Sequence, residues 1–424
     1  MARGALRQQA PDNDRVDTPG AAPASDRPAS AAAPGWLWDV FCRVVDNLGD
    51  VGVCWRLARA LALHGQRVRL WIDEPGALTW MAPHGAPGVQ WARWARPWPA
   101  AHAAWEPGEV VIEAFGCELP PEVLATLASR ARAPQGPPLW IDLEYLSAEP
   151  WVARSHGLPS PQFHGPSAGL TRWFYFPGFG PGTGGLLREP GLLRARAAFD
   201  RDAWLAARSL ARSPGERVIV VFCYDDAPAL GQLVAAFAAA AGPGPIRVLL
   251  TPGAAQRAWA GRFGGSPRSD GPDPSYGWHP SYGSDGSAVR VQVLPLLAQE
   301  EFDRLLWSAD LATVRGEDSL VRAIWAGVPF LWQAYRQDDG VQATKVEAML
   351  AALAAPPGLA AGLADAWRAW NAIPGPAGPA GSLVLPLLAP WGAAVRAWRE
   401  RLAAGPDLAT QLLDFARAHR PCAG

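Results

Sequence analysis

Residues 36–73 read WLWDVFCRVVDNLGDVGVCWRLARALALHGQRVRLWID, and this stretch predicts a strand, a turn, a helix and a second strand in succession. The apolar run at 36–45 is typical of a buried strand, and apolar residues recur at helical spacing over 51–63. The second strand follows at 67–73. Because a helical crossover between neighbouring strands makes them parallel, the stretch indicates an α/β fold.

The same alternation begins again in the second half of the chain. A strand from Arg217 (RVIVVFCY), an alanine-rich helix at 229–241 and a strand from Ile246 (IRVLLTPG) repeat the pattern. We therefore predict two Rossmann-like domains that face a central cleft, with ligands at the carboxyl ends of the strands. The expected parts are a disordered extension (1–35), an N-terminal domain (36–212) on which a C-terminal helix (400–424) packs back, a C-terminal domain (213–399) and a surface insertion (264–287).

Composition excludes several classes of protein. The 424 residues include 38 Lys+Arg and 39 Asp+Glu, so no global positive field exists to hold nucleic acid or an anionic membrane. Gly and Pro are abundant, but the chain is 49% hydrophobic, which favours a packed protein. The five cysteines form no CxxC pair and the histidines show no HxxxH spacing, so we expect no bound metal and no disulfide framework. With neither a signal peptide nor a membrane span apparent, we expect a cytoplasmic protein.

The first candidate site is the turn between the first strand and the first helix. Asp46 and Asp50 flank Asn47 and Gly49 there, which puts two carboxylates on a loop at the predicted cleft. Asp50 is also positioned to cap the helix, where the helix dipole would keep a carboxylate ionised and able to act as a base. The alternative is purely structural, with Asp50 an N-cap and Asp46 a turn residue.

The second candidate site is the segment Arg315-Gly316-Glu317-Asp318-Ser319, again between a strand and a helix that begins near Ser319. Backbone N–H groups, the Ser319 hydroxyl and the Arg315 guanidinium could surround a diphosphate there. Glu317 could accept hydrogen bonds from sugar hydroxyls. The alternative is a turn that only caps the following helix.

Two aromatic residues, Phe222 and Tyr224, close the strand VIVVFCY. Their alternate spacing places both rings on one side of the strand, where they could stack on a nucleobase. Aromatic residues of a strand also commonly pack in a core, so the cleft nearby is what favours binding.

Together these residues resemble a known family, the bacterial protein-arginine rhamnosyltransferases that modify elongation factor P (the EarP family). The resemblance covers roughly residues 38–350, and the combination of its first and last motifs is far more specific than either alone. The matching stretches are WDVFCRVVDNLGDVGVCWRLARAL (38–61), WIDLEYLSAEPWV (140–152), HGLPSPQ (156–162), FYFPGFGPGTGGLLREPGLL (174–193) and RGEDSLVRAIWAGVPFLWQAY (315–335).

The resemblance implies a two-domain GT-B glycosyltransferase that moves L-rhamnose from dTDP-β-L-rhamnose to one arginine of elongation factor P with inversion. It implies no metal or other cofactor. The expected catalytic residues are Asp50 as general base, Asp46 as its companion carboxylate, and Glu317. The expected donor-binding residues are Asn47, Gly49, Phe222, Tyr224, Gln299, Arg315, Gly316, Asp318, Ser319 and Tyr335, of which Phe222, Tyr224 and Gln299 match the thymidine subsite.

Three positions depart from the family pattern. Gln333 stands where histidine is common, and Arg336 and Gln342 stand where proline and histidine are expected. Two other interpretations remain open: a GT-B transferase that uses another nucleotide sugar for a small molecule or glycan, and a non-catalytic module that binds a nucleotide sugar or elongation factor P. The second alternative requires Asp46 and Asp50 to face away from the cleft.

Overall fold

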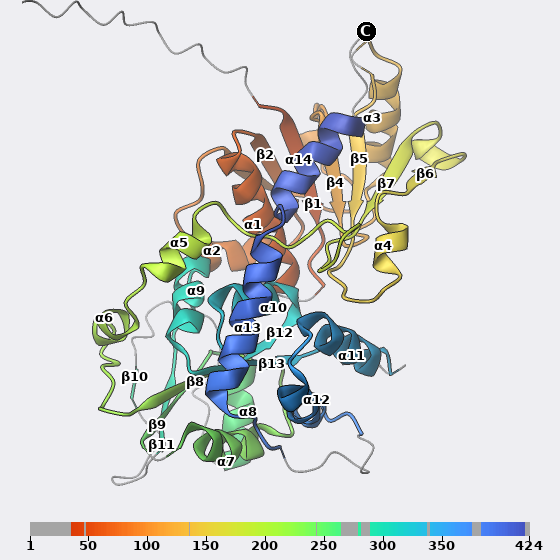
Figure 1. Cartoon of the computed structure of the whole chain (residues 1–424). Coiled ribbons are helices and arrows are strands. Elements are labelled where there is room, and N and C mark those ends of the chain that lie inside the picture. Colours follow the sequence, from red (N-terminus) through yellow and green to blue (C-terminus); the bar gives the residue numbers. More distant parts are fainter. Residues whose placement is uncertain are drawn as a thin grey trace, which may run out of the picture. The chain divides into compact units, whose positions relative to one another are not determined.

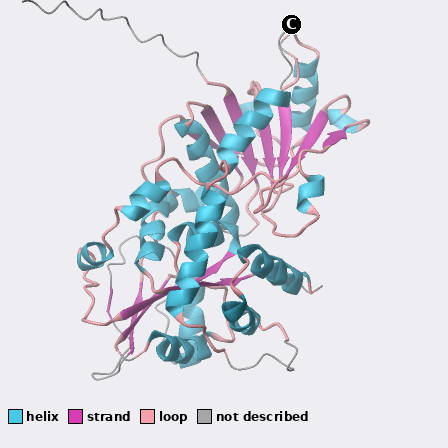
Figure 2. Ribbon diagram, viewed as in Figure 1, coloured by secondary structure: helices cyan, strands magenta, loops and turns pink. Residues whose placement is uncertain are grey.

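The chain folds around two mainly parallel β-sheets (Figures 1 and 2). The structure is a computed structural model. It describes residues 35–45, 48–134, 136–242, 244–263, 279–280, 289–336, 340–374 and 383–419. The predicted disordered extension, Asp46, Asn47 and nearly all of the predicted insertion at 264–287 therefore lie outside the described residues.

The N-terminal half is built on a seven-stranded sheet in the order β3-β2-β1-β4-β5-β7-β6, in which only the β6–β7 pair is antiparallel. Its strands are β1 (Leu37–Cys42), β2 (Arg67–Ile72), β3 (Val89–Arg93), β4 (Val110–Ala114), β5 (Leu139–Leu143), β6 (Pro159–Pro161) and β7 (Thr171–Tyr175). Its helices are α1 (Gly49–Leu63), α2 (Leu78–Met81), α3 (Pro121–Ala131) and α4 (Val152–Ser155), with 3-10 turns η1 (Pro75–Ala77), η2 (Ala100–His102) and η3 (Gly165–Ser167).

The C-terminal half is built on a six-stranded sheet in the order β10-β11-β9-β8-β12-β13, with β10 antiparallel to β11. Its strands are β8 (Arg217–Val221), β9 (Ile246–Leu250), β10 (His279–Pro280), β11 (Val289–Val293), β12 (Leu311–Arg315) and β13 (Phe330–Gln333). The helices that follow the N-terminal sheet are α5 (Leu192–Ala197), α6 (Arg201–Ala206), α7 (Leu230–Ala241), α8 (Ala254–Phe263), α9 (Gln299–Ser308), α10 (Gly316–Ala326), α11 (Val341–Leu353), α12 (Pro357–Trp370), α13 (Leu388–Ala403) and α14 (Leu408–His419).

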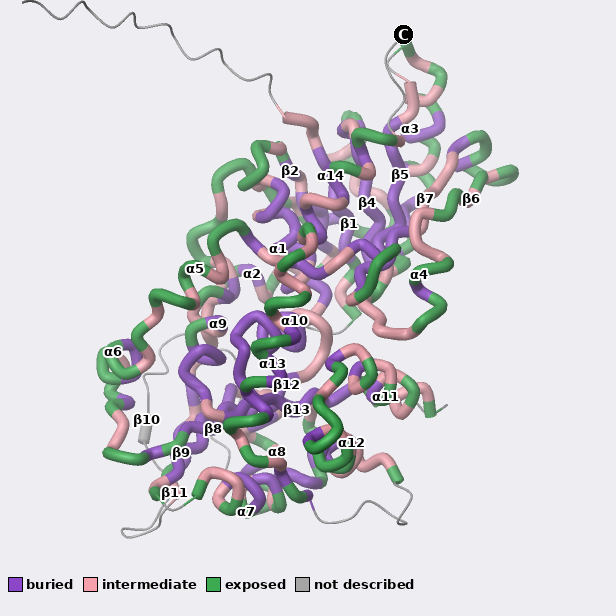
Figure 3. The backbone as a smooth tube through the Cα atoms, in the orientation of Figure 1, coloured by how far each residue is buried: buried purple, intermediate pink, exposed green. Residues whose placement is uncertain are grey.

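Burial explains which strands the sequence predicts well. The predicted strands β1, β8 and β9 are buried at all, or all but one, of their residues (Figure 3). Strands covered on both faces read as nearly continuous apolar runs, and each of these three strands contains one charged residue, Asp39, Arg217 and Arg247 respectively. The strands β3 and β7 are only partly buried, and the sequence pattern does not predict them.

The two C-terminal helices divide between the halves. Helix α13 packs against α10, whereas α14 packs against α1 and supplies Leu412 and Leu413 to the apolar core of the N-terminal half (Figure 1). The ring of Phe415 on α14 also contacts Trp173 and Tyr175 of β7. Among the helices that the structure describes, none is both long and apolar enough to cross a membrane.

Candidate functional site

The start of α1 carries the first group of predicted site residues, of which Gly49 and Asp50 are described. Helix α1 begins at Gly49, and Leu48 occupies the N-cap position without a side-chain cap. The prediction that Asp50 caps the helix is therefore wrong. Asp50 is the second helical residue, only 3% exposed, and its Oδ2 accepts a hydrogen bond from the backbone N–H of Val45 at 2.8 Å. The carboxylate turns back onto the loop that leaves β1.

The second group of predicted site residues forms the start of α10, which begins at Gly316 rather than near Ser319 as the sequence predicts. Gly316 has a φ of 63°, a left-handed conformation that suits glycine and lets β12 turn directly into the helix. The Ser319 hydroxyl donates to the carbonyl of Arg315 and accepts from its N–H at 3.0 Å. Ser319 thus braces the strand-to-helix turn itself.

The Arg315 side chain joins this turn to the two predicted aromatic residues. Its guanidinium carbon lies 4.7 Å from the ring centroid of Phe222 and 4.5 Å from that of Tyr224. The Tyr335 ring lies 5.7 Å from that of Tyr224, approaches it edge-on and is 59% exposed. Since β8 ends at Val221, both aromatics follow the strand instead of lying within it. The structure brings these four side chains together at the carboxyl edge of the C-terminal sheet.

Gln299, the first residue of α9, reaches across to the N-terminal half. It is buried, and its Nε2 donates to the carbonyl oxygen of Gly52 in α1 at 3.0 Å. Its Oε1 is buried and has no hydrogen-bond partner among the described residues. A buried acceptor without a partner is costly unless a ligand or water supplies a donor.

The two acidic residues of α10 point to different partners. Glu317 Oε2 accepts a hydrogen bond from the backbone N–H of Leu146 at 2.9 Å, just after β5 of the N-terminal half. Asp318 Oδ1 forms an ion pair at 2.8 Å with Nε of Arg56 in α1. Both carboxylates therefore connect the start of α10 to the N-terminal half.

Arg56 belongs to a buried ion cluster that the sequence motifs do not predict. Its five members are Arg56, Glu189, Asp303, Asp318 and Arg322. The one signal in the sequence is an arginine placed between apolar neighbours in a buried helix (WRLARAL). Its partners are more than 100 residues away along the chain, so spacing could not have found them.

Charge within the cluster fixes the ionisation of its members. Burial alone would lower the pKa of Arg56, but the carboxylates of Asp303, Asp318 and Glu189 raise it above its ordinary value. Burial would raise the pKa of Glu189, but Arg322 and Arg56 hold it well below its usual range. For Asp318 burial dominates and raises the pKa, with Arg56 opposing. Burial thus makes Asp318 easier to protonate than an exposed aspartate.

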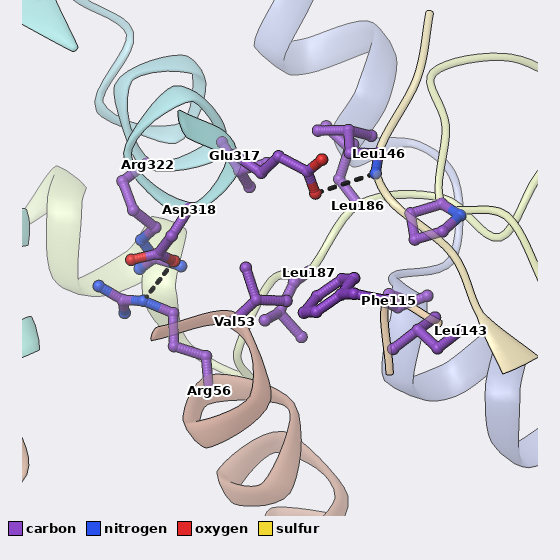
Figure 4. A pocket seen from close by; sticks show the side chains of 13 residues that line it. Val53, Arg56, Phe115, Leu143, Leu146, Leu186, Leu187, Glu317, Asp318 and Arg322 are labelled. Atoms are coloured by element: carbon purple, nitrogen blue, oxygen red, sulfur yellow. Dashed lines mark hydrogen bonds and ion pairs between the residues drawn. The ribbon is translucent and has the colours of Figure 1, made fainter. Parts of the chain in front are cut away.

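A small cavity lies beside this cluster, between the two halves (Figure 4). Val53 and Phe115 line it from the N-terminal half, and Glu317 and Arg322 line it from α10. Its free volume is about 30 Å³, room for about two water molecules. The cavity is therefore too small for a nucleotide sugar, and it marks the seam between the halves.

The three departures from the family pattern lie at or near the aromatic cluster. Gln333 Oε1 accepts from the N–H of Tyr224 at 2.8 Å, and its Nε2 donates to the Asp226 carbonyl at 3.1 Å. Gln333 therefore holds the loop that presents Tyr224. Arg336 pairs with the Asp226 carboxylate at 3.4 Å, and Gln342 hydrogen-bonds Asn371 Oδ1 at 3.2 Å. Through these contacts, Gln333 and Gln342 support the loops that follow β8 and β13.

Two α/β halves with candidate residues at the carboxyl edges of mainly parallel sheets are the arrangement found in GT-B glycosyltransferases, and the chain has this fold. Residues 38–417 match the family described as Elongation-Factor P (EF-P) rhamnosyltransferase EarP. A protein-arginine rhamnosyltransferase of Pseudomonas aeruginosa is 43% identical over 399 residues, which cover 89% of this chain and 98% of the relative. One of Pseudomonas putida is 44% identical over 405 residues, which cover 90% and 98%.

A solved structure, reported as the structural basis for EarP-mediated arginine glycosylation of translation elongation factor EF-P, is 31% identical and superposes with a TM-score of 0.58. The match covers 91% of this chain and 99% of that one. The chain therefore belongs to the EarP family of protein-arginine rhamnosyltransferases, which are glycosyltransferases.

Proposed function

We propose that this protein transfers L-rhamnose from dTDP-β-L-rhamnose to an arginine side chain of translation elongation factor P, with inversion at the anomeric carbon. The observation that carries the proposal is the meeting of two helix starts. Helix α1 brings Asp50 from one half, helix α10 brings Glu317 and Asp318 from the other, and direct contacts join the two helices.

The donor belongs on the C-terminal half in this proposal. Phe222 and Tyr224 offer ring faces for the thymine, and the unpaired Oε1 of Gln299 offers an acceptor for an N–H of a base. The Arg315 guanidinium and the first N–H groups of α10 supply positive charge for the diphosphate as it leaves. The proposal needs no metal, because these donors can stabilise the developing charge.

The acceptor arginine requires a base. A guanidinium has a pKa above about 12, so one of its nitrogens must lose a proton as it attacks. In the proposed step the C–N bond to the anomeric carbon forms while the C–O bond to the diphosphate breaks, and the proton passes to Asp50. Asp46 is its proposed companion. The backbone bond from Val45 fixes one oxygen of the Asp50 carboxylate, which supports an oriented base.

The test separates donor from acceptor. We expect dTDP-β-L-rhamnose to bind more tightly than UDP- or GDP-sugars in competition titrations, and the purified protein to transfer rhamnose to elongation factor P. Asp50→Asn should bind the donor as the wild type does and lose turnover. Preference for another nucleotide sugar would indicate a different donor, and a fully active Asp50→Asn variant would remove the base assignment. Since its acceptor is a translation factor, we place the reaction in the cytoplasm.

A further inference from the structure

The segment 186–189, which leaves the N-terminal sheet and leads to α5, contacts a different element at almost every residue. The Leu186 carbonyl accepts from the N–H of Leu408 at the start of α14 at 3.0 Å, and the Leu187 carbonyl accepts from Trp325 Nε1 of α10 at 2.8 Å. The Arg188 guanidinium donates to the carbonyl of Ala403 at the end of α13 and to that of Gly405 in the connection to α14. Three consecutive residues thus reach α10, the start of α14 and the end of α13.

The fourth residue of the segment, Glu189, bridges the two halves. Its Oε1 lies 3.0 Å from Nη1 of Arg56 on α1, and its Oε2 lies 2.6 Å from Nη1 of Arg322 on α10. Asp303 of α9 repeats the arrangement, since its carboxylate pairs with both guanidinium groups at 2.7–3.2 Å. Each of these two carboxylates therefore bridges Arg56 of the N-terminal half and Arg322 of the C-terminal half.

Arg56 occupies the centre of this cluster. Its Nε pairs with Asp318, its Nη1 with Glu189, and its Nη2 with Asp303. Its side chain is 1% exposed, so water and salt screen these contacts much less than they screen ion pairs at the surface. The planar guanidinium holds Glu189 and Asp303 by directed hydrogen bonds and Asp318 by an ion pair, a combination that a lysine ammonium on a flexible stem cannot reproduce.

We propose that Arg56 and Glu189 are positioning residues that fix the start of α10, with Glu317 and Asp318, against the start of α1, with Asp50, before either substrate binds. This inference rests on the proposed function for its effect on catalysis. Asp50 lies six residues before Arg56 on the same helix, and Asp318 lies four residues before Arg322. Any shift of one guanidinium thus moves a helix start that carries a predicted site residue.

The matched experiment compares Arg56→Lys with Arg247→Lys. Arg247 forms another buried ion pair, Nη2 to Glu216 Oε2 at 3.1 Å, but both residues belong to the C-terminal half and lie at the amino ends of β8 and β9, away from the carboxyl edge that carries the candidate site. Each change keeps the charge and removes the guanidinium fork. We expect Arg56→Lys to lower kcat roughly 100-fold, the loss typical of a small misplacement of reacting groups.

The donor dissociation constant should change much less than kcat in Arg56→Lys, because the contacts among Phe222, Tyr224 and Arg315 do not involve Arg56. Arg247→Lys should keep both kcat and donor affinity. Hydrogen–deuterium exchange gives a readout that does not need activity: amides of 50–56 and 316–322 should exchange faster in Arg56→Lys than in Arg247→Lys. If the wild type transfers no rhamnose but this exchange difference is observed, the proposed function is wrong, whereas Arg56 still fixes the start of α10 against the start of α1.

Three results would overturn the positioning role: unchanged kcat and exchange in Arg56→Lys, equal losses in both variants, or a fall in donor affinity that accounts for the loss of turnover. Glu189→Gln provides a second test if Arg56→Lys does not fold, because it keeps the shape of the side chain and both arginines. We expect it to show the same split between kcat and donor affinity, with a smaller loss. An unchanged kcat in a folded Glu189→Gln protein would also refute the role of Glu189.

Discussion

Gly52 lies where α1 meets α9 and α10, and replacing it by alanine tests how tightly the halves fit. A Cβ at this position would lie 3.3 Å from Asp318 Oδ2 and 3.3 Å from Gln299 Nε2. Neither the Asp318 nor the Gln299 side chain can easily move away from such a Cβ atom. Asp318 is held by Arg56 at 2.8 Å, and Gln299 Nε2 is bonded to the carbonyl of Gly52 itself at 3.0 Å.

Two opposing magnitudes determine the expected stability of Gly52→Ala. Glycine to alanine in a helix normally stabilises by about 1 kcal/mol. Overpacking against fixed neighbours destabilises by about 1–3 kcal/mol. The sum predicts a free energy of unfolding that is unchanged or up to about 2 kcal/mol lower. The displaced neighbours include predicted donor-side residues, so kcat should fall as well.

Gly261 in α8 is the matched control, because nothing lies within 4 Å of a Cβ built there. Gly261→Ala should gain the ordinary stabilisation of about 1 kcal/mol and leave activity unchanged. Urea unfolding of both variants, followed by circular dichroism and compared with the wild type, measures the difference. If Gly52→Ala is stabilised as much as Gly261→Ala and remains fully active, the fit between α1 and α10 is looser than the structure indicates.

Three further predictions concern substitutions of single residues. Arg315→Met should weaken dTDP binding roughly 10- to 100-fold, the value of a hydrogen bond to a charged group; calorimetry measures this, and unchanged affinity would exclude a diphosphate contact. Gly316→Ala should lower the free energy of unfolding by about 1–2 kcal/mol, because φ is 63° there; urea unfolding that matches the wild type would contradict the strained turn. Burial raises the pKa of Asp142 to about 6 although Arg172 opposes it, and burial also raises the pKa values of Glu113 and Glu144 nearby. In the folded state Asp142 therefore keeps its proton up to about pH 6, whereas in the unfolded chain it releases the proton near pH 4. The contribution of Asp142 to the free energy of unfolding is therefore lost as the pH rises from about 4 to about 6. Asp142→Asn should show a shallower fall in stability between about pH 4 and pH 6, and an unaltered pH profile would count against the shift.

The sequence predicts the parts of the fold that depend on local pattern. The apolar run before Asp46 and the helical spacing after Asp50 predict β1 and α1, because a buried strand and an amphipathic helix each leave a characteristic periodicity. The partly buried β3 and β7 leave no such signal. The sequence also does not predict that the helices begin at Gly49 and Gly316, because the backbone conformation at a glycine cannot be inferred from its neighbours.

The candidate site is likewise predicted only in part from the sequence. Phe222, Tyr224 and Arg315 are predicted from strand ends, and the structure brings them together because parallel strands share one carboxyl edge. The contacts of Asp318 and Gln299 across the halves depend on tertiary packing alone. The catalytic and donor-binding roles of these residues remain predictions.

The most direct measurement is the mass of elongation factor P after incubation with this protein and dTDP-β-L-rhamnose, followed by fragmentation to locate the modification. We predict one added deoxyhexose on a single arginine with the wild-type protein, and none with Asp50→Asn at matched concentration. An unmodified factor with the wild type, under conditions in which another family member modifies it, would contradict the proposed function.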